Sequence, residues 1–178
     1  MAAREKWEVE GVLAVKRKYG LLVIVVGFIL LLDQWTKYVV VEHLTLYQRV
    51  QVIQGFFDLT HVRNTGGAFG MLSGEKGGLG SFLFLGVSFL AVGIILFLIQ
   101  RMKEHEIRLS VALSLVLGGA LGNLIDRFRY GEVIDFLDLY VSSFHWPAFN
   151  IADASICVGI GLMALELLRR DGKKRTVR

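Results

Sequence analysis

The chain has 178 residues, of which 54% are hydrophobic and 20% are charged, and its formal net charge is +4. A mean hydropathy of +0.55 is too high for an ordinary soluble domain, and a single proline in so apolar a chain argues against disorder. The basic residues form no single stripe, so no nucleic-acid partner is expected. The one cysteine, Cys157, excludes an intrachain disulfide, and its apolar surroundings make it a poor nucleophile. These properties indicate a membrane protein.

Four stretches of the chain are apolar over the roughly 20 residues that a helix needs to cross a bilayer. They lie at about residues 19–41, 78–99, 109–125 and 150–168. The first is expected to be a retained anchor rather than a cleaved signal peptide, because DQWTK follows it with no small-x-small cleavage site. The predicted fold class is a mainly α membrane protein, a four-transmembrane-helix bundle within residues 19–168.

Basic residues flank these spans unevenly. They are concentrated in an N-terminal extension (1–18), in the short turn at 100–108 and in a basic tail (169–178). By the positive-inside rule, both termini and this turn are cytoplasmic, and the connections 42–77 and 126–149 are extracytoplasmic.

Both extracytoplasmic connections contain strand-like sequence. Residues 57–62 alternate with a period of two, Gly66 and Gly67 then predict a turn, and YGEVIDFLDLY is rich in β-branched and aromatic residues. We expect a small extracytoplasmic β-sheet/loop subdomain beside the bundle.

Polar residues gather at the outer ends of the spans, where an ionisable group costs about 2.5–3.5 kcal/mol and therefore suggests a site. They are Asp33, Lys37, Asn123, Asp126, Arg127, Asp135, Asn150 and Asp153. Each also has a structural explanation. Asp33 and Lys37 could be a helix-end ion pair, and Asp126 and Arg127 could end the third span. Asp153 could sit in the first turn of the fourth helix, after Asn150 as its N-cap.

The residue types at these positions favour carboxylate chemistry. The four histidines are scattered without a metal-binding pair, so no metal and no cofactor is expected. TGGAFG lacks the spacing and the Lys-Ser/Thr of a phosphate loop. Two close carboxylates do not both ionise readily, so one keeps a proton while the other acts as a base. Such a pair is suited to activating water against an amide bond.

Four motifs give the chain a family resemblance: DQWTK at 33–37, RNTGGAFG at 63–70, GNLIDRFRYGEVIDF at 122–136 and FNIADASI at 149–156. Together and in this order, they resemble the lipoprotein signal peptidases (signal peptidase II), aspartic proteases of the bacterial inner membrane. The resemblance implies a catalytic pair, Asp135 and Asp153. On sequence logic alone Asp126 competes with Asp135 for the first role. The resemblance assigns substrate-binding or supporting roles to the remaining motif residues: Asp33, Lys37, Asn64, Gly66, Asn123, Asp126, Arg127 and Asn150.

The resemblance also implies a reaction. The substrate is a prolipoprotein whose Cys carries a diacylglyceryl group, and the enzyme cuts just before that Cys near the extracytoplasmic face of the membrane. Substrate and membrane lipids are the expected partners, with no obligate protein partner. Two alternatives remain at this point: a small polytopic transporter that uses the polar cluster as an ion path, and a membrane assembly protein that uses Gly-rich helix faces.

Overall fold

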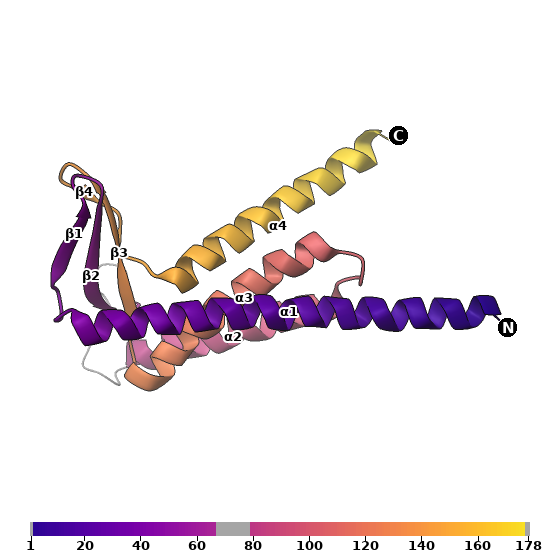
Figure 1. Cartoon of the computed structure of the whole chain (residues 1–178), viewed down its shortest axis with the longest axis horizontal. Helices are drawn as coiled ribbons and strands as arrows, with labels where there is room; N and C mark the ends of the chain where they lie inside the picture. The colour runs from indigo at the N-terminus through magenta and orange to yellow at the C-terminus, as the bar shows by residue number, and fades with distance from the viewer. Residues whose placement is uncertain (1, 67–78, 177–178) are drawn as a thin grey trace.

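The computed structural model describes residues 2–66 and 79–176, with side-chain surroundings for residues within 18–66 and 82–170. Within the described residues, four helices and four strands follow one another (Figure 1). In chain order they are α1 (Ala2–His43), β1 (Arg49–Ile53), β2 (Phe57–Asn64), α2 (Leu79–Arg101), α3 (Ile107–Tyr130), β3 (Val133–Val141), β4 (Phe144–His145) and α4 (Ile151–Thr176). Gly67, part of the expected turn, lies outside the described residues.

Each helix contains one stretch that is long and apolar enough to span a membrane. These stretches are Lys18–His43, Phe82–Arg101, Ile107–Tyr130 and Ile151–Arg170, and each carries one of the predicted spans. The predicted N-terminal extension continues α1 as helix from Ala2 onward. The fold class is thus the predicted one, a mainly helical membrane protein with a small sheet.

The third helix runs past the expected end of its span. It ends only at Tyr130, where Gly131 takes the left-handed conformation (φ 76°) and its N–H donates to the carbonyl of Arg127. Asp126 and Arg127 therefore lie in the last turns of a helix and not in the connection. Because both residues belong to the helix, the backbone of α3 fixes the direction in which each side chain leaves it.

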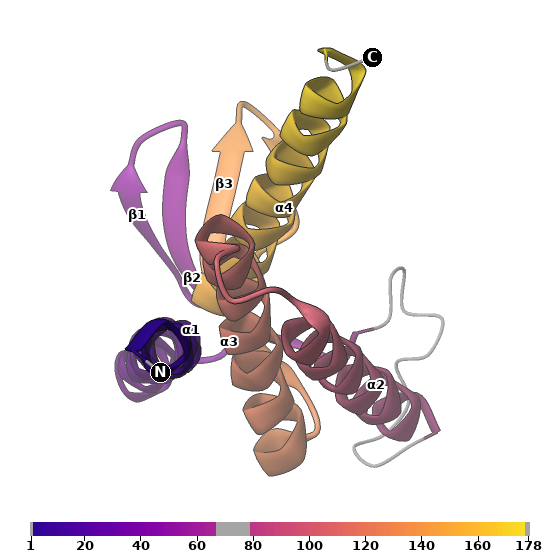
Figure 2. The ribbon, with the colours of Figure 1, turned by 90° about the vertical axis from the view of Figure 1, so that its right-hand side faces the viewer.

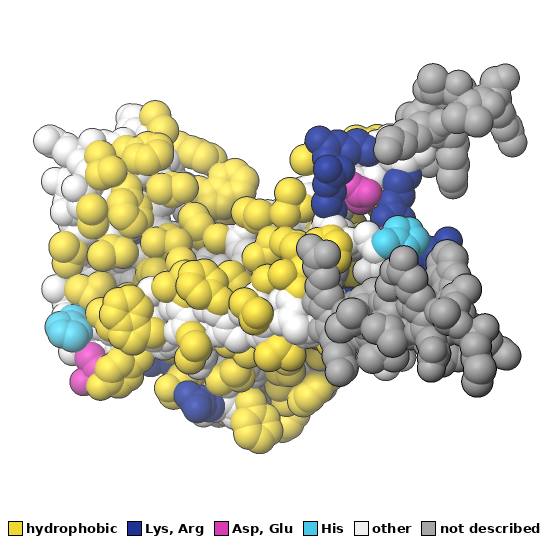
Figure 3. Space-filling model, turned by 45° about the vertical axis from the view of Figure 1, so that its right-hand side comes forward, with side chains coloured by type: hydrophobic (Ala, Val, Ile, Leu, Met, Phe, Trp, Pro, Cys, Tyr) yellow, Lys and Arg dark blue, Asp and Glu magenta, His cyan; other side chains and the backbone are white. Residues whose placement is uncertain are grey.

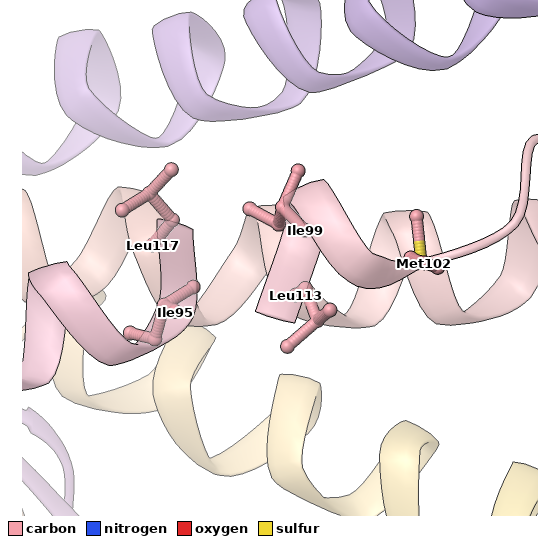
Figure 4. Packing of buried hydrophobic residues seen from close by; sticks show 5 residues of the cluster. All are labelled: Ile95, Ile99, Met102, Leu113 and Leu117. Carbon is pink, nitrogen blue, oxygen red and sulfur yellow. The ribbon is translucent and has the colours of Figure 1, made fainter. Parts of the chain in front are cut away.

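α3 is the central helix, and it packs against α1, α2 and α4 (Figure 2). In its span 61% of the residues are buried, against 11–17% in the other three spans. A small apolar cluster joins it to α2: Ile95 and Ile99 of α2, with Met102 just after that helix, meet Leu113 and Leu117 of α3 (Figure 4). The other helices leave most of their apolar side chains on the outside, as is expected where lipid replaces a protein core.

The four strands form one antiparallel sheet in the order β1-β2-β3-β4, at the end of the helices away from both termini (Figure 1). β2 and β3 confirm the two predicted strands, whereas β1 and β4 were not foreseen. Between Leu59 and Val62 the β2–β3 register shifts by a bulge, after which Val62 lies opposite Asp135. Bulges re-aim neighbouring side chains, and this one lies beside a predicted catalytic residue.

A second apolar cluster attaches the sheet to the bundle. Val40 of α1 packs with Ile134 and Phe136 of β3, and Ile151 at the start of α4 joins them. The chain leaves along β3, turns back through β4 and pairs again, with backbone hydrogen bonds in both directions between Leu137 and Phe149. This return delivers the start of α4 next to the residues that precede Leu137.

The described surface is strongly apolar along the helices. Figure 3 shows hydrophobic side chains over most of one face, with most of the visible Lys and Arg gathered toward one end of it. Large side chains such as Phe28, Leu31, Phe82 and Leu168 are more than 60% exposed. Such a belt of exposed apolar side chains is what a bilayer covers.

Candidate active site

Asp135 and Asp153 are carried by different elements that the return hairpin brings together. Asp135 lies on β3 and is 1% exposed, and Asp153 lies in the first turn of α4 and is partly buried. Asn150 touches both: its Nδ2 donates to Asp135 Oδ1 at 2.7 Å, and its backbone N–H donates to Asp153 Oδ2 at 3.2 Å. The two aspartates that the family resemblance singled out therefore share one site.

The start of α4 is a reciprocal cap. Asn150 Oδ1 accepts the backbone N–H of Asp153 at 2.9 Å, while Asp153 Oδ2 accepts the N–H of Asn150. The predicted N-cap at Asn150 is thus confirmed. The capping contact uses only one oxygen of Asp153, Oδ2, so capping does not occupy the whole carboxylate. Its other oxygen, Oδ1, accepts from Asn123 Nδ2 at 2.8 Å.

Asn64 holds Asp135 from the opposite side. Its Nδ2 donates to Asp135 Oδ2 at 2.8 Å, and its Oδ1 accepts the N–H of Gly66 at 2.8 Å. Gly66 has a φ of 87°, and a Cβ there would come within 2.8 Å of the Phe84 ring of α2. A glycine is therefore needed for the turn that orients the Asn64 amide.

Burial raises the pKa of the Asp135 carboxyl to about 6. The Asn64 hydrogen bond opposes this rise and the Asp153 charge adds to it, while Asn150 and the positive charge of Lys37 lower the pKa. Asp135 therefore retains a proton at a pH where ordinary carboxyls have lost theirs.

A buried ion cluster lies beneath the pair of aspartates. Lys37 Nζ lies 2.8 Å from Asp33 Oδ2 and 2.8 Å from Asp126 Oδ2, and all three side chains are at most 2% exposed. Lys37 also donates to Asn123 Oδ1 at 3.0 Å. Because that oxygen is occupied, the Asn123 amide nitrogen is directed to Asp153.

The two carboxylates of this cluster also hold backbone groups. Asp33 Oδ1 accepts the N–H of Ala152 at 2.9 Å, and Asp126 Oδ2 accepts the N–H of Ile134 at 3.2 Å. Ala152 and Ile134 are the residues immediately before Asp153 and Asp135. The ion cluster therefore binds the backbone of both chain segments that carry the central aspartates. The sequence alone did not predict these backbone contacts.

Arg127 completes the set of predicted site residues. It lies one turn after Asn123 on α3, where its Nη1 donates to the Asn123 carbonyl at 3.5 Å. The charges of Asp153, Asp135 and Asp126 all act on its guanidinium. Among the described residues, no group of three or more His, Cys, Asp or Glu side chains could hold a metal ion.

Comparison with known proteins identifies the family. The family model described as Signal peptidase (SPase) II matches residues 25–169. The chain belongs to the signal peptidase II family. The "Lipoprotein signal peptidase" of Syntrophus aciditrophicus is 43% identical over 159 residues, covering 89% of this chain and 99% of that protein. The protein of the same name from Geobacter sulfurreducens is 45% identical over 145 residues, covering 82% and 89%.

Solved structures agree with this assignment. A structure described as a bacterial membrane enzyme superposes with a TM-score of 0.77 at 32% identity, covering 87% of this chain and 92% of that one. A second, described in the same words, gives a TM-score of 0.74 at 33% identity and covers 84% and 93%. This signal peptidase II chain is therefore a membrane peptidase.

One contact of the site was missed in the sequence. Gln34 Nε2 lies 3.0 Å from Asp126 Oδ1 and 3.1 Å from Asp33 Oδ2. Its position three residues before Lys37, on the same side of an otherwise apolar helix, was the signal available.

Proposed function

We propose that this signal peptidase II removes the signal peptide from diacylglyceryl-modified prolipoproteins, cutting just before the lipid-modified Cys with a pair of aspartates that activates water. The observation that supports it most directly is the shared site of Asp135 and Asp153, each held by amide donors within a largely buried polar network. The family assignment supports the class of substrate, since the relatives named above are lipoprotein signal peptidases.

The two aspartates take different roles in this proposal. Asp135 holds the proton, because burial and the neighbouring charge raise its pKa to about 6. Asp153 accepts hydrogen bonds from Asn123 and from the Asn150 backbone, and in this proposal it is the base. It takes a proton from a water molecule, and the resulting hydroxide attacks the scissile carbonyl.

Asp135 polarises that carbonyl through its proton, so the developing oxyanion is stabilised as it forms. When the tetrahedral intermediate collapses, the C–N bond breaks and the leaving amine of the Cys receives a proton from the pair. One water is consumed, the new carboxyl end belongs to the signal peptide, and the pair returns to its starting protonation. Arg127 lies beside this site with donors suited to a substrate carbonyl or ester.

Location is part of the proposal. The site lies at one end of four membrane-spanning helices, which we assign to the extracytoplasmic face of the bacterial inner membrane. A signal peptide and the acyl chains of the lipid both lie in the bilayer. The peptide bond before the lipid-modified Cys is therefore expected at the membrane surface, where this site lies.

Substitution of each aspartate tests the mechanism. Asp135→Asn and Asp153→Asn should each abolish cleavage of a lipid-modified prolipoprotein while the protein still inserts and folds. Asp138→Asn is the matched control, because Asp138 lies on the same strand but pairs with His145 and Arg49. Full activity of either Asp135→Asn or Asp153→Asn would refute the dyad. EDTA should leave cleavage unchanged, and a loss that zinc restores would show a metal mechanism.

A further inference from the structure

Gln34 lies on α1 between the two acidic supports of the site. Its Nε2 is within hydrogen-bonding distance of three acceptors: Asp126 Oδ1 at 3.0 Å, Asp33 Oδ2 at 3.1 Å and the Gly122 carbonyl at 3.3 Å. The first two belong to different helices, so one amide group links α1 to α3 at the level of the ion cluster.

The hydrogen bonds of the two supporting carboxylates show what this amide contributes. Asp33 Oδ1 accepts from Ala152 N–H, and its Oδ2 accepts from Lys37 and Gln34. Asp126 Oδ2 accepts from Lys37 and from Ile134 N–H.

For Asp126 Oδ1, Gln34 is the one donor found among the described residues. Asp126 is 1% exposed, and a buried carboxylate oxygen without a donor is costly. Gln34 therefore completes the hydrogen bonding of this support.

The charge of the cluster gives the amide a second effect. Two carboxylates share the ammonium of Lys37 in a buried place. The amide of Gln34 donates to both carboxylates without adding charge. It thus offsets their repulsion and keeps them at the spacing that the lysine bridges.

That spacing reaches the catalytic pair through the backbone. Asp33 binds the N–H just before Asp153, and Asp126 binds the N–H just before Asp135. A change in the separation of the two supports would therefore move the two catalytic carboxylates relative to each other.

We propose that Gln34 is a positioning residue of this peptidase: by cross-linking Asp33 and Asp126, it sets the distance between the segments that carry Asp153 and Asp135. The inference rests on the proposed dyad. The two proposals can fail separately, because the dyad is tested by substituting Asp135 and Asp153 while Gln34 is unchanged.

Gln34→Met tests the proposal, since methionine matches the length of glutamine but cannot donate. The kcat per folded enzyme should fall about ten- to a hundredfold with KM within about twofold, because misplaced catalytic groups slow the chemical step more than they weaken binding. Trp35→Phe is the matched control, because Trp35 is the next residue on α1 and is 63% exposed. A wild-type kcat in folded Gln34→Met enzyme would overturn the proposal.

If Gln34→Met does not fold, Gln34→Glu decides the question. Glutamate has the size of glutamine, but once ionised it has no donor for Asp33 or Asp126 and repels both carboxylates. At a pH where this glutamate is ionised, the kcat of the folded variant should fall about ten- to a hundredfold with KM within about twofold. A wild-type kcat in folded Gln34→Glu enzyme would overturn the proposal.

Discussion

Asp135 and Asp153 have the same side chain but different surroundings, and the proposed roles of acid and base rest on this difference. Asp135 is enclosed on β3 and contacts two amide groups, those of Asn64 and Asn150. Asp153 is less buried and accepts one of its hydrogen bonds from the backbone at the start of its own helix. A proton shared between them is therefore expected to reside on Asp135.

The pH dependence of cleavage should report this assignment. The pKa of Asp135 is raised to about 6, so in the free enzyme its proton is present below this pH and is lost above it. As the general acid must be protonated, kcat/KM should fall as pH rises through about 6, and kcat should fall at a higher pH because bound substrate excludes water. Steady-state rates measured across this pH range report the fall of kcat/KM and the fall of kcat separately. An increase of kcat/KM through the same interval would make Asp135 the base instead.

Asn64→Leu should change the pH at which kcat/KM falls. Asn64 donates to Asp135, and this hydrogen bond lowers the pKa of Asp135. Without it the pKa should rise further, so the fall of kcat/KM should move to higher pH, and kcat should drop because the carboxyl loses one of its two amide contacts. Gln51→Leu is the control, since Gln51 lies in the same sheet but binds the Tyr140 hydroxyl. A fall of kcat/KM at the same pH as in the wild type would contradict the role given to Asn64.

At the scale of the elements, the close packing of α3 against α4 positions Asp153. A Cβ added at Gly119 of α3 would collide with the Ala152 carbonyl oxygen and lie 2.5 Å from Ser155 Oγ. Both contacts are with the first turns of α4, next to Asp153. The absence of a side chain at Gly119 therefore allows α4 to begin where it does.

Gly119→Ala should accordingly destabilise the protein and slow it. Overpacking costs about 1–3 kcal/mol, and displacement of α4 should also lower kcat. Gly93→Ala on α2 is the control, because nothing lies within 4 Å of the added Cβ, and it should change stability by no more than about 1 kcal/mol. Thermal unfolding in detergent and cleavage rates measure the two effects. Equal behaviour of the two variants would show that this helix contact is dispensable.

Elements with a strong local pattern could be predicted from the sequence, and those that depend on distant partners could not. The four long apolar runs and the alternation in β2 are local signals. All five residues of β1 are exposed and β4 has two residues, so neither shows a buried face in its pattern. The charges of Asp126 and Arg127 are typical of a span that ends at the interface, but α3 continues to Tyr130, with Asp126 paired to Lys37 of α1.

The candidate site divides in the same way. The ordered motifs were enough to point to Asp135 and Asp153, but the links between them are not local in sequence. The contacts of Asp33 with Ala152 N–H and of Asp126 with Ile134 N–H are made to backbone groups, which have no residue type to recognise. Gln34 carried only the weak signal of one more polar residue in a helix.

For the whole molecule, the distribution of charge indicates how the bundle lies in the membrane. Lys18 Nζ, at the start of the first span, donates to the Met102 carbonyl at 2.9 Å, and Arg170 of α4 pairs with Glu106. Basic residues of α1 and α4 therefore both contact the connection between α2 and α3. The sheet lies at the other end (Figure 1), and Asp135 is on its strand β3. α1 has 42 residues and is about 63 Å long at 1.5 Å per residue, so it extends past a bilayer of about 40–45 Å.

Because basic flanks remain in the cytoplasm, we expect both termini inside and the sheet outside. Alkaline phosphatase fused after Arg178 should be inactive and a fluorescent protein at the same place should fluoresce, whereas phosphatase inserted at Gly55 should be active. Gly55 suits the insertion, since it lies in the turn between β1 and β2 with nothing within 4 Å of an added Cβ. Active phosphatase at the C-terminus would show that the topology is the inverse of the one expected here. The aspartate site would then face the cytoplasm, and a prolipoprotein whose lipid-modified Cys lies at the outer surface could not reach it.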